Sequence, residues 1–364
     1  MLIRSFFAVF CLFLSGCFAH SFPTANSFIE VGEVSDHKAE VVQVFVDANG
    51  TFYPNGWQRF SSIRSPWKAD SLLNSLDEGE ALRSLIEKEE VRQLQEIKNA
   101  ADRSDRIFVL IHGFNNTVDE AMPAYSEIER KLDLREDDLV VRFYWDGLTG
   151  KRGGQAKIWF NAVGYSQLAG LRGLRRMLSQ INDKPIYLIS HSRGASVITS
   201  ALANPVYDPD FLEDTQAVVR TWGSEYQNFF APGPVAENEN RFHILMLAPA
   251  IDRVDFCDES QQRTTDGGYD CKKFKNLGQQ LASLRYTVNT GDPILDKIVG
   301  LSNNFNPTGL GVDPKVGAFL RANHYPFMVE HKFDRPMGDH KFLNYVKHSS
   351  FDAMLAEEGI GKTD

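Results

Sequence analysis

The sequence predicts an α/β fold in which a mostly parallel central sheet is covered by helices on both faces. Apolar runs of strand length alternate with helical segments from about residue 106 to residue 290, at the spacing of strand–helix–strand crossovers. The chain of 364 residues is long enough for one large domain. Its composition, 43% hydrophobic and 24% charged, is typical of a globular protein.

Each expected strand is an apolar run bounded by turn residues. The runs are RIFVLIHGF (106–114), DLVVRFYWDG (138–147), KPIYLIS (184–190), FHILMLAPAID (242–252) and SLRYTVNT (283–290). Helices are expected between them, at 117–132, about 155–181 and 195–203. Crossovers of this kind bring the carboxyl ends of the strands to one edge of the sheet, where functional groups collect.

The segments outside this alternation are less regular. VVQVFVD (41–47), the turn Ala48-Asn49-Gly50 and TFYP predict a hairpin. Residues 68–100 predict one or two helices. Two insertions are expected, near 204–240 and 301–335, because both segments are long for crossover connections. The first carries Trp222, Tyr226, Phe229 and Phe230 and forms either a lid over an apolar site or a surface excursion.

Residues 1–16 have the features of a signal peptide, with Arg4 before an apolar run too short to span a bilayer. The run ends in Leu14-Ser15-Gly16-Cys17, which resembles a bacterial lipobox, in which the cysteine is acylated. A tether (17–38) would then lead to the main domain at 39–364. Ordinary cleavage after Ala19 and a retained membrane anchor are alternatives. All three predict an exported protein, and the lipobox predicts a lipid anchor on the periplasmic or cell-surface side of a bacterial membrane.

The four cysteines fit an exported protein. Cys11 leaves with the signal and Cys17 is the acylated residue. Cys257 and Cys271 flank a polar loop, and an oxidising compartment favours a disulfide between them over a free pair. No CxxC or Cys/His cluster occurs, so no metal site is expected. The net charge of −9 argues against nucleic-acid binding.

YLISHSRGAS (187–196) is close to the G-x-S-x-G nucleophile elbow, with Ser190 in the place of the first glycine. Ser192 lies between an expected strand and helix, where a sharp turn would expose its hydroxyl. The positions two before and two after must be small, and Ser190 and Gly194 meet that demand. The alternative is a serine that only caps the helix.

HGFNN (112–116) ends an earlier strand and predicts one half of an oxyanion hole. Its donors would be the backbone N–H groups of Phe114 and Arg193, directed at charge that develops in the transition state. His112 is expected to be structural. The Arg193 side chain either binds a substrate carboxylate or, as we prefer, points into the fold and pairs with an acid.

The acid and base should follow later strands. Asp292, in NTGDP, is the expected acid and Asp252, in APAID, its rival; either is otherwise a turn residue. Among four late histidines, His340 is the expected base because it precedes the closing helix, and His348 is next. Ser192, Asp292 and His340 follow the chain order of a Ser–Asp–His triad.

HGFNN, VVRFYWDG, SHSRG, YTVNTGDPIL and GDHKF together resemble an α/β-hydrolase, from an uncharacterised bacterial branch with an HGFNN signature. The resemblance covers about residues 40–355. It implies an eight-stranded sheet, a serine nucleophile and no cofactor. Most relatives have glycine at position 190, where this chain has serine.

These observations predict a serine hydrolase, similar to esterases and lipases, that cleaves a small-molecule or lipid carboxylic ester through an acyl-enzyme. A non-catalytic binding lipoprotein on a hydrolase scaffold is one alternative, because fold does not imply function. An amidase or peptidase with the same triad is the other. The sequence does not indicate the oligomeric state.

Overall fold

The computed structural model describes residues 18–19, 37–53, 79–150, 163–205, 237–258, 273–296, 308–333 and 340–362. Within them, seven parallel strands form one sheet in the order β2-β4-β3-β6-β7-β8-β9. Their bounds are β2 (Glu40–Val46), β3 (Arg106–Ile111), β4 (Asp138–Trp145), β6 (Pro185–His191), β7 (Arg241–Leu247), β8 (Leu281–Val288) and β9 (Met328–Lys332). The predicted fold class is confirmed, with seven strands among these residues where the resemblance implied eight.

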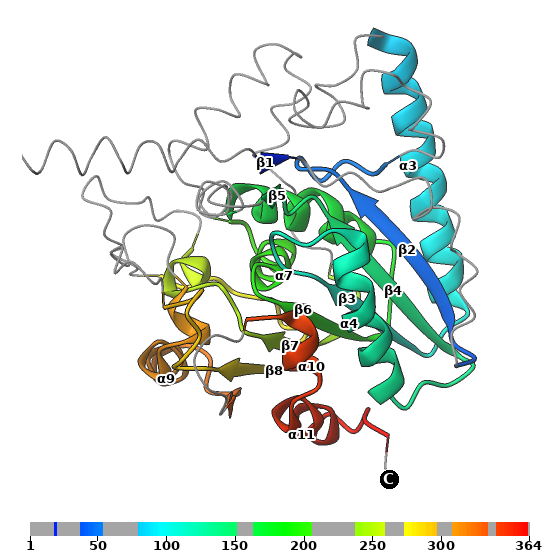
Figure 1. Ribbon diagram of the computed structural model, residues 1–364. Coiled ribbons are helices and arrows are strands. Elements are labelled where there is room, and N and C mark those ends of the chain that lie inside the picture. Colours follow the sequence, from blue (N-terminus) through cyan, green and yellow to red (C-terminus); the bar gives the residue numbers. More distant parts are fainter. Residues whose placement is uncertain are drawn as a thin grey trace, which may run out of the picture.

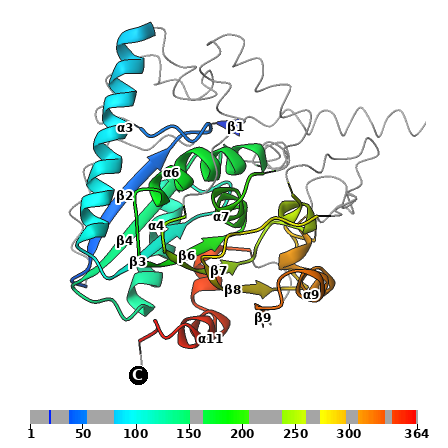
Figure 2. The same ribbon diagram turned by 180° about the vertical axis from the view of Figure 1, so that it is seen from behind.

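Helices cover both faces of the sheet (Figures 1 and 2). The helices are α3 (Gly79–Asp102), α4 (Val118–Lys131), α6 (Arg175–Leu178), α7 (Gly194–Leu202), α9 (Pro314–Asn323), α10 (Phe342–Val346) and α11 (Ser349–Glu357). A π-helical turn at Ala169–Leu174 precedes α6, and short 3₁₀ turns lie at Arg253–Phe256 and Gly309–Gly311.

Two apolar clusters explain this layering. Along β3 the side chains alternate: Ile107 and Val109 pack with α3, α6 and α7, whereas Phe108 and Leu110 pack with α4, α10 and α11. Successive residues of a strand point to opposite faces, so a continuous apolar run is the pattern that a strand covered on both faces requires. Each fully buried aliphatic side chain contributes about 1.5–3 kcal/mol to this packing.

The predicted hairpin at the first strand is only partly present. Residues 47–51 turn, and Val46 and Phe52 form an isolated antiparallel bridge. The main neighbour of β2 is instead β4, with which it pairs in parallel over its whole length. Seven residues pair there, whereas the returning segment is described only as far as Tyr53, whose N–H donates to the Phe45 carbonyl.

The expected insertion at 301–335 also differs from the structure. Its described part, from residue 308, contains α9 and then β9, which pairs with β8 as the last strand of the described sheet. The sequence signal was weak because MVEHK is a short edge strand with polar, titratable residues at three of its five positions.

Several predictions concern residues outside the described ranges: the signal sequence with Cys17, most of the tether, residues 206–236 of the expected lid, and Cys271. The Cys257–Cys271 disulfide therefore stays a prediction.

A two-stranded ladder joins β1 (Phe18–Ala19) to β5 (Thr149–Gly150), which follows β4 in the chain. Within the ranges given above, no helix has the length and apolar character needed to cross a membrane.

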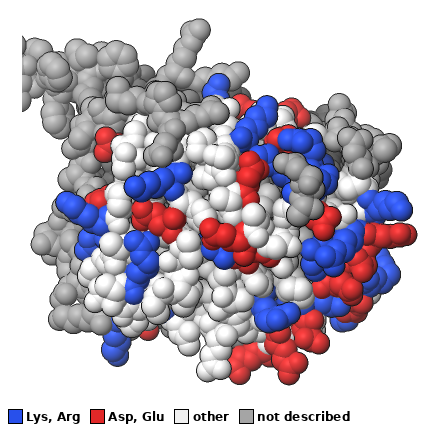
Figure 3. Space-filling model, turned by 90° about the horizontal axis from the view of Figure 1, so that it is seen from below, with Lys and Arg blue, Asp and Glu red and all other residues white. Residues whose placement is uncertain are grey.

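Acidic and basic side chains alternate on the face of the molecule seen from below (Figure 3). Ion pairs also join separate elements of the fold, as Arg285 of β8 pairs with Glu357 and Glu358 at the end of α11. Neither the acidic nor the basic side chains form a continuous patch over the described part of this face.

Candidate active site

Three strand ends deliver the predicted catalytic side chains to one edge of the sheet. Ser192 directly follows β6, Asp292 lies four residues after β8, and His340 precedes α10 in the segment that follows β9. Because the strands are parallel, all three stand beyond carboxyl ends, where ligands of such folds bind.

The three side chains form a hydrogen-bonded chain. His340 Nε2 lies 3.1 Å from Ser192 Oγ, and His340 Nδ1 lies 2.7 Å from Asp292 Oδ2. Ser192 is 1% exposed and Asp292 fully buried, whereas the His340 side chain is 13% exposed. The distances are those required of a nucleophile, a base and a residue that orients the base.

The backbone at Ser192 has the conformation of a tight strand-to-helix elbow. Its φ is +52°, in the left-handed region that residues other than glycine seldom adopt. Three backbone hydrogen bonds hold it: the Ser192 N–H donates to Leu247, and its carbonyl accepts from Ala195 and Ala250. The surrounding backbone thus stabilises a conformation that is unfavourable by itself.

Small residues around the elbow allow two chain segments to cross. A Cβ atom on Gly194 would lie 2.8 Å from the carbonyl oxygen of His112, so glycine is required there. Ser190 is buried within β6, and its φ is negative. The missing first glycine therefore causes no backbone strain.

The HGFNN segment lies directly against the nucleophile. A Cβ on Gly113 would come within 2.8 Å of the Ser192 Cβ and 3.1 Å of the His191 carbonyl oxygen. The next residue is Phe114, whose backbone N–H we predicted as an oxyanion donor together with that of Arg193. Arg193 directly follows Ser192, and the role of both N–H groups as donors remains a proposal.

His112 is hydrogen-bonded to this turn and to the end of β4. The Trp145 backbone N–H donates to Nε2 of His112, so Nδ1 carries the proton and donates to the carbonyl of Gly113. The Trp145 indole N–H donates to the His112 carbonyl. Burial lowers the pKa of His112 to about 4, so the ring is neutral near pH 7. These contacts fit the structural role expected of it.

The two candidate acids have different partners. Asp292 Oδ1 accepts the backbone N–H groups of Ile294 and Leu295, and Oδ2 faces His340. Asp252 instead caps the turn at Arg253–Phe256 and accepts the Gly309 N–H. Its carboxylate thus accepts hydrogen bonds from backbone N–H groups, which is the role of a turn residue considered above.

The other late histidines serve the packing. His348 caps the N-terminus of α11 and packs against the Phe333 ring. His331 lies beside Glu357, and His324 packs against Phe274. Among the four candidates, His340 is the one hydrogen-bonded to Ser192.

The Arg193 side chain points into the fold, as we preferred. It is 1% exposed. Burial raises the pKa of Asp255, and the nearby positive charge of Arg193 partly offsets that rise. This is the arrangement of a buried cation beside a buried acid.

Sequence reasoning missed three residues around the triad. Tyr345 donates to Asp292, and Asn289 donates to Tyr345. His191 is buried with its ring centroid 5.0 Å from that of His340, and it stacks on Phe342. Asn289 lies in the quoted YTVNTGDPIL motif, but nothing in the sequence indicates that Tyr345 reaches it.

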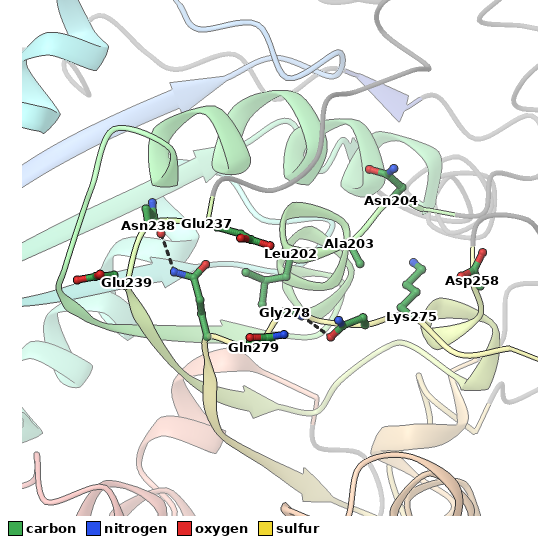
Figure 4. Close-up of a pocket in the computed structure, with 12 residues that line it drawn as sticks. Leu202, Ala203, Asn204, Glu237, Asn238, Glu239, Asp258, Lys275, Gly278 and Gln279 are labelled. Carbon is green, nitrogen blue, oxygen red and sulfur yellow. Dashed lines mark hydrogen bonds between the residues drawn. The ribbon is translucent and has the colours of Figure 1, made fainter.

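A cavity of about 590 Å³ lies elsewhere, at the amino-terminal edge of the sheet (Figure 4). Its lining includes Leu202 at the end of α7 and Asn238 before β7, which accepts a hydrogen bond from Gln280 before β8. Since α7 starts at the elbow and ends here, this cavity is distinct from the site at Ser192.

In the part of the chain that the structure describes, no three His, Cys, Asp or Glu residues are placed to hold a metal ion.

A family model described as "Alpha/beta hydrolase of unknown function (DUF900)" matches residues 87–284, which is more than half of the chain. That range contains β3 to β7, the first half of β8 and Ser192, whereas Asp292 and His340 follow it. No curated protein matches the chain.

Proposed function

Because the chain belongs to the alpha/beta-hydrolase family of unknown function (DUF900), we propose that it is a serine hydrolase that cleaves carboxylic esters. The observation that carries the proposal is the chain of contacts from Ser192 Oγ through His340 to Asp292, at 3.1 and 2.7 Å. The strained backbone of Ser192 supports it, because such strain persists in proteins mainly where function uses it.

In the first half-reaction, Ser192 Oγ attacks the ester carbonyl carbon while His340 Nε2 takes the hydroxyl proton. Asp292 holds the imidazole in place and stabilises the imidazolium. The backbone N–H groups of Phe114 and Arg193 stabilise the oxyanion. When the intermediate collapses, the bond to the leaving oxygen breaks, His340 protonates that oxygen, and an alcohol departs from the acyl-enzyme.

In the second half-reaction, water attacks the acyl carbon while His340 Nε2 accepts one of its protons. A second oxyanion forms in the same place. Its collapse breaks the bond to Ser192 Oγ, which regains a proton from His340, and the carboxylic acid leaves. The overall reaction consumes one water and needs no cofactor.

Hydrolysis of p-nitrophenyl butyrate by the full chain tests this function. Ser192→Ala is expected to lower kcat by at least about 1,000-fold, because the nucleophile and its base act as a unit. Ser196→Ala is the matched control: it removes another buried hydroxyl, one helical turn away on α7, that has no hydrogen-bond partner among the described residues. Equal loss in both variants, or activity unchanged in Ser192→Ala, would contradict the proposal. A parallel panel of p-nitroanilides measures any amide preference.

We also propose that Cys17 carries a lipid anchor that holds the protein on the outer side of a bacterial membrane. Cys17 directly precedes β1, which pairs with β5, and β5 follows the carboxyl end of β4. The lipobox Leu14-Ser15-Gly16-Cys17 supports this anchor. Cys17→Ala should abolish labelling of the protein by an alkyne-bearing fatty acid supplied to the cells, without changing hydrolysis of a soluble ester, and labelling that persists in the variant would contradict the proposal.

A further inference from the structure

Two donors meet one oxygen of Asp292. His340 Nδ1 lies 2.7 Å from Oδ2, and the Tyr345 hydroxyl lies 2.9 Å from the same atom. Oδ1 already accepts two backbone N–H groups, from Ile294 and Leu295. The carboxylate thus accepts four hydrogen bonds, and only one of them comes from the base.

The direction of the Tyr345 hydrogen bond is fixed by its neighbour. Asn289 Nδ2 lies 3.1 Å from the phenolic oxygen, and an amide NH₂ can only donate. The Gly291 N–H donates to Asn289 Oδ1, which settles the orientation of the amide. The tyrosine proton is therefore left for Asp292. The Tyr345 ring, fully buried, stacks on Phe333 with the ring centroids 3.9 Å apart.

From this geometry we infer that Tyr345, held by Asn289, is a positioning residue that locks Asp292 to the segment bearing the base and moderates its negative charge. The inference rests on the proposed function of the triad. Tyr345 and His340 belong to one segment, whereas Asn289 and Asp292 belong to the loop after β8. The two segments are thus joined at Asp292 twice, once through the imidazole and once independently of it.

The electrostatic consequence has a definite sign. A hydrogen bond to the charged form of a carboxylate spreads its charge. Removing the phenol leaves more negative charge on Oδ2, which favours the imidazolium form of His340. The acid limb of the pH–rate profile should then move to higher pH.

The other titratable groups that pack against His340 do not obscure this effect. Besides Asp292 and Tyr345, the described residues place His191 of β6 against the imidazole. Burial holds the pKa of His191 well below its usual value, so this ring stays neutral where the enzyme would work.

Tyr345→Phe tests the inference, since it keeps the ring on Phe333 and removes only the hydroxyl. We expect kcat for p-nitrophenyl butyrate to fall roughly 10-fold, because one hydrogen bond to a charged group is lost, with little change in KM. The acid-limb midpoint should rise by about half a pH unit or more. Asn289→Ala should shift it in the same direction, but less.

Tyr325→Phe is the matched control. Its hydroxyl is also buried and donates to the Lys275 carbonyl, and none of its described contacts involve the triad. It should leave the midpoint and kcat unchanged. A Tyr345→Phe profile that coincides with the control overturns the inference while wild-type turnover preserves the proposed function.

A second measurement does not depend on turnover. In the Ser192→Ala background, NMR titration of the His340 ring protons compares chains with and without Tyr345→Phe. An upward shift of the titration midpoint supports the inference, and coincident curves overturn it. A wild-type enzyme that hydrolyses no ester contradicts the proposed function, whereas this titration still reports whether Tyr345 moderates the charge of Asp292.

Discussion

Gly113 and Ser192 approach each other so closely that a Cβ atom on Gly113 would lie 2.8 Å from the Cβ of the serine. Real Cβ atoms do not approach that closely without displacing their neighbours. The HGFNN turn and the nucleophile elbow, which are distant in the chain, therefore fit together only if position 113 has no side chain. This close fit brings the predicted oxyanion donor and the nucleophile into one site.

We predict that Gly113→Ala lowers kcat for p-nitrophenyl butyrate by about 100-fold or more, because the methyl group separates the turn from Ser192 and disturbs oxyanion stabilisation. Gly359→Ala is the control. Gly359 has φ +67°, and a methyl group there would meet no neighbouring atom within 4 Å, so alanine should cost about 1–2 kcal/mol of stability and leave kcat unchanged. Full activity in Gly113→Ala would show that the turn plays no part in catalysis.

A substitution at Ser190, in contrast, is expected to preserve activity and not to lower stability. Its hydroxyl is buried and finds no hydrogen-bond partner within the described ranges, and an unsatisfied buried polar group costs about 1–3 kcal/mol. Ser190→Ala should therefore unfold at an equal or higher urea concentration than wild type and keep its activity within about two-fold. A clear loss of activity would mean that this hydroxyl contributes to the elbow.

Stability should fall in mild acid because His112 is buried as a neutral ring. Its folded pKa is about 4, whereas an unfolded histidine has a pKa of about 6.5. Between these values the unfolded chain binds a proton that the folded chain does not, so the free energy of unfolding decreases as pH falls. The decrease from His112 is on the order of 3 kcal/mol between about pH 7 and pH 4, and buried His191 adds to it. Urea denaturation at several pH values measures it.

His112→Gln provides the comparison for that measurement. Glutamine can still donate to the Gly113 carbonyl and accept from the Trp145 N–H, but it does not titrate. The slope of stability against pH should be shallower in the variant between about pH 6.5 and 4. Identical slopes would show that His112 does not govern acid sensitivity.

The apolar runs predicted the inner strands well because a strand buried on both faces leaves an unambiguous pattern. The edge strands were harder to predict from the sequence. β9 mixes polar, titratable and apolar residues over five positions, and β2 pairs in parallel with a strand far along the chain. Nothing local in the sequence determines such a partner.

The residues of the candidate site also divide into those that the sequence indicated and those that it did not. Ser192, Asp292 and His340 were predictable because each lies beside a strand end or a closing helix, and the chain order of a triad is restrictive. Tyr345 and Asn289 were not, because their roles depend on how two segments meet after folding. The place of His112 in the HGFNN turn set it apart from the candidate bases, and its hydrogen bonds go to that turn and to Trp145.

The central claim, that Ser192 is a nucleophile activated by His340 and Asp292, is tested most directly by a fluorophosphonate probe. The purified full chain is treated with the probe and digested, and the modified peptide is identified by mass spectrometry. We predict a single phosphonylated residue, Ser192, with labelling lost in Ser192→Ala and strongly slowed in His340→Ala. Absence of labelling in the wild-type chain, or labelling that persists in Ser192→Ala, would contradict the account.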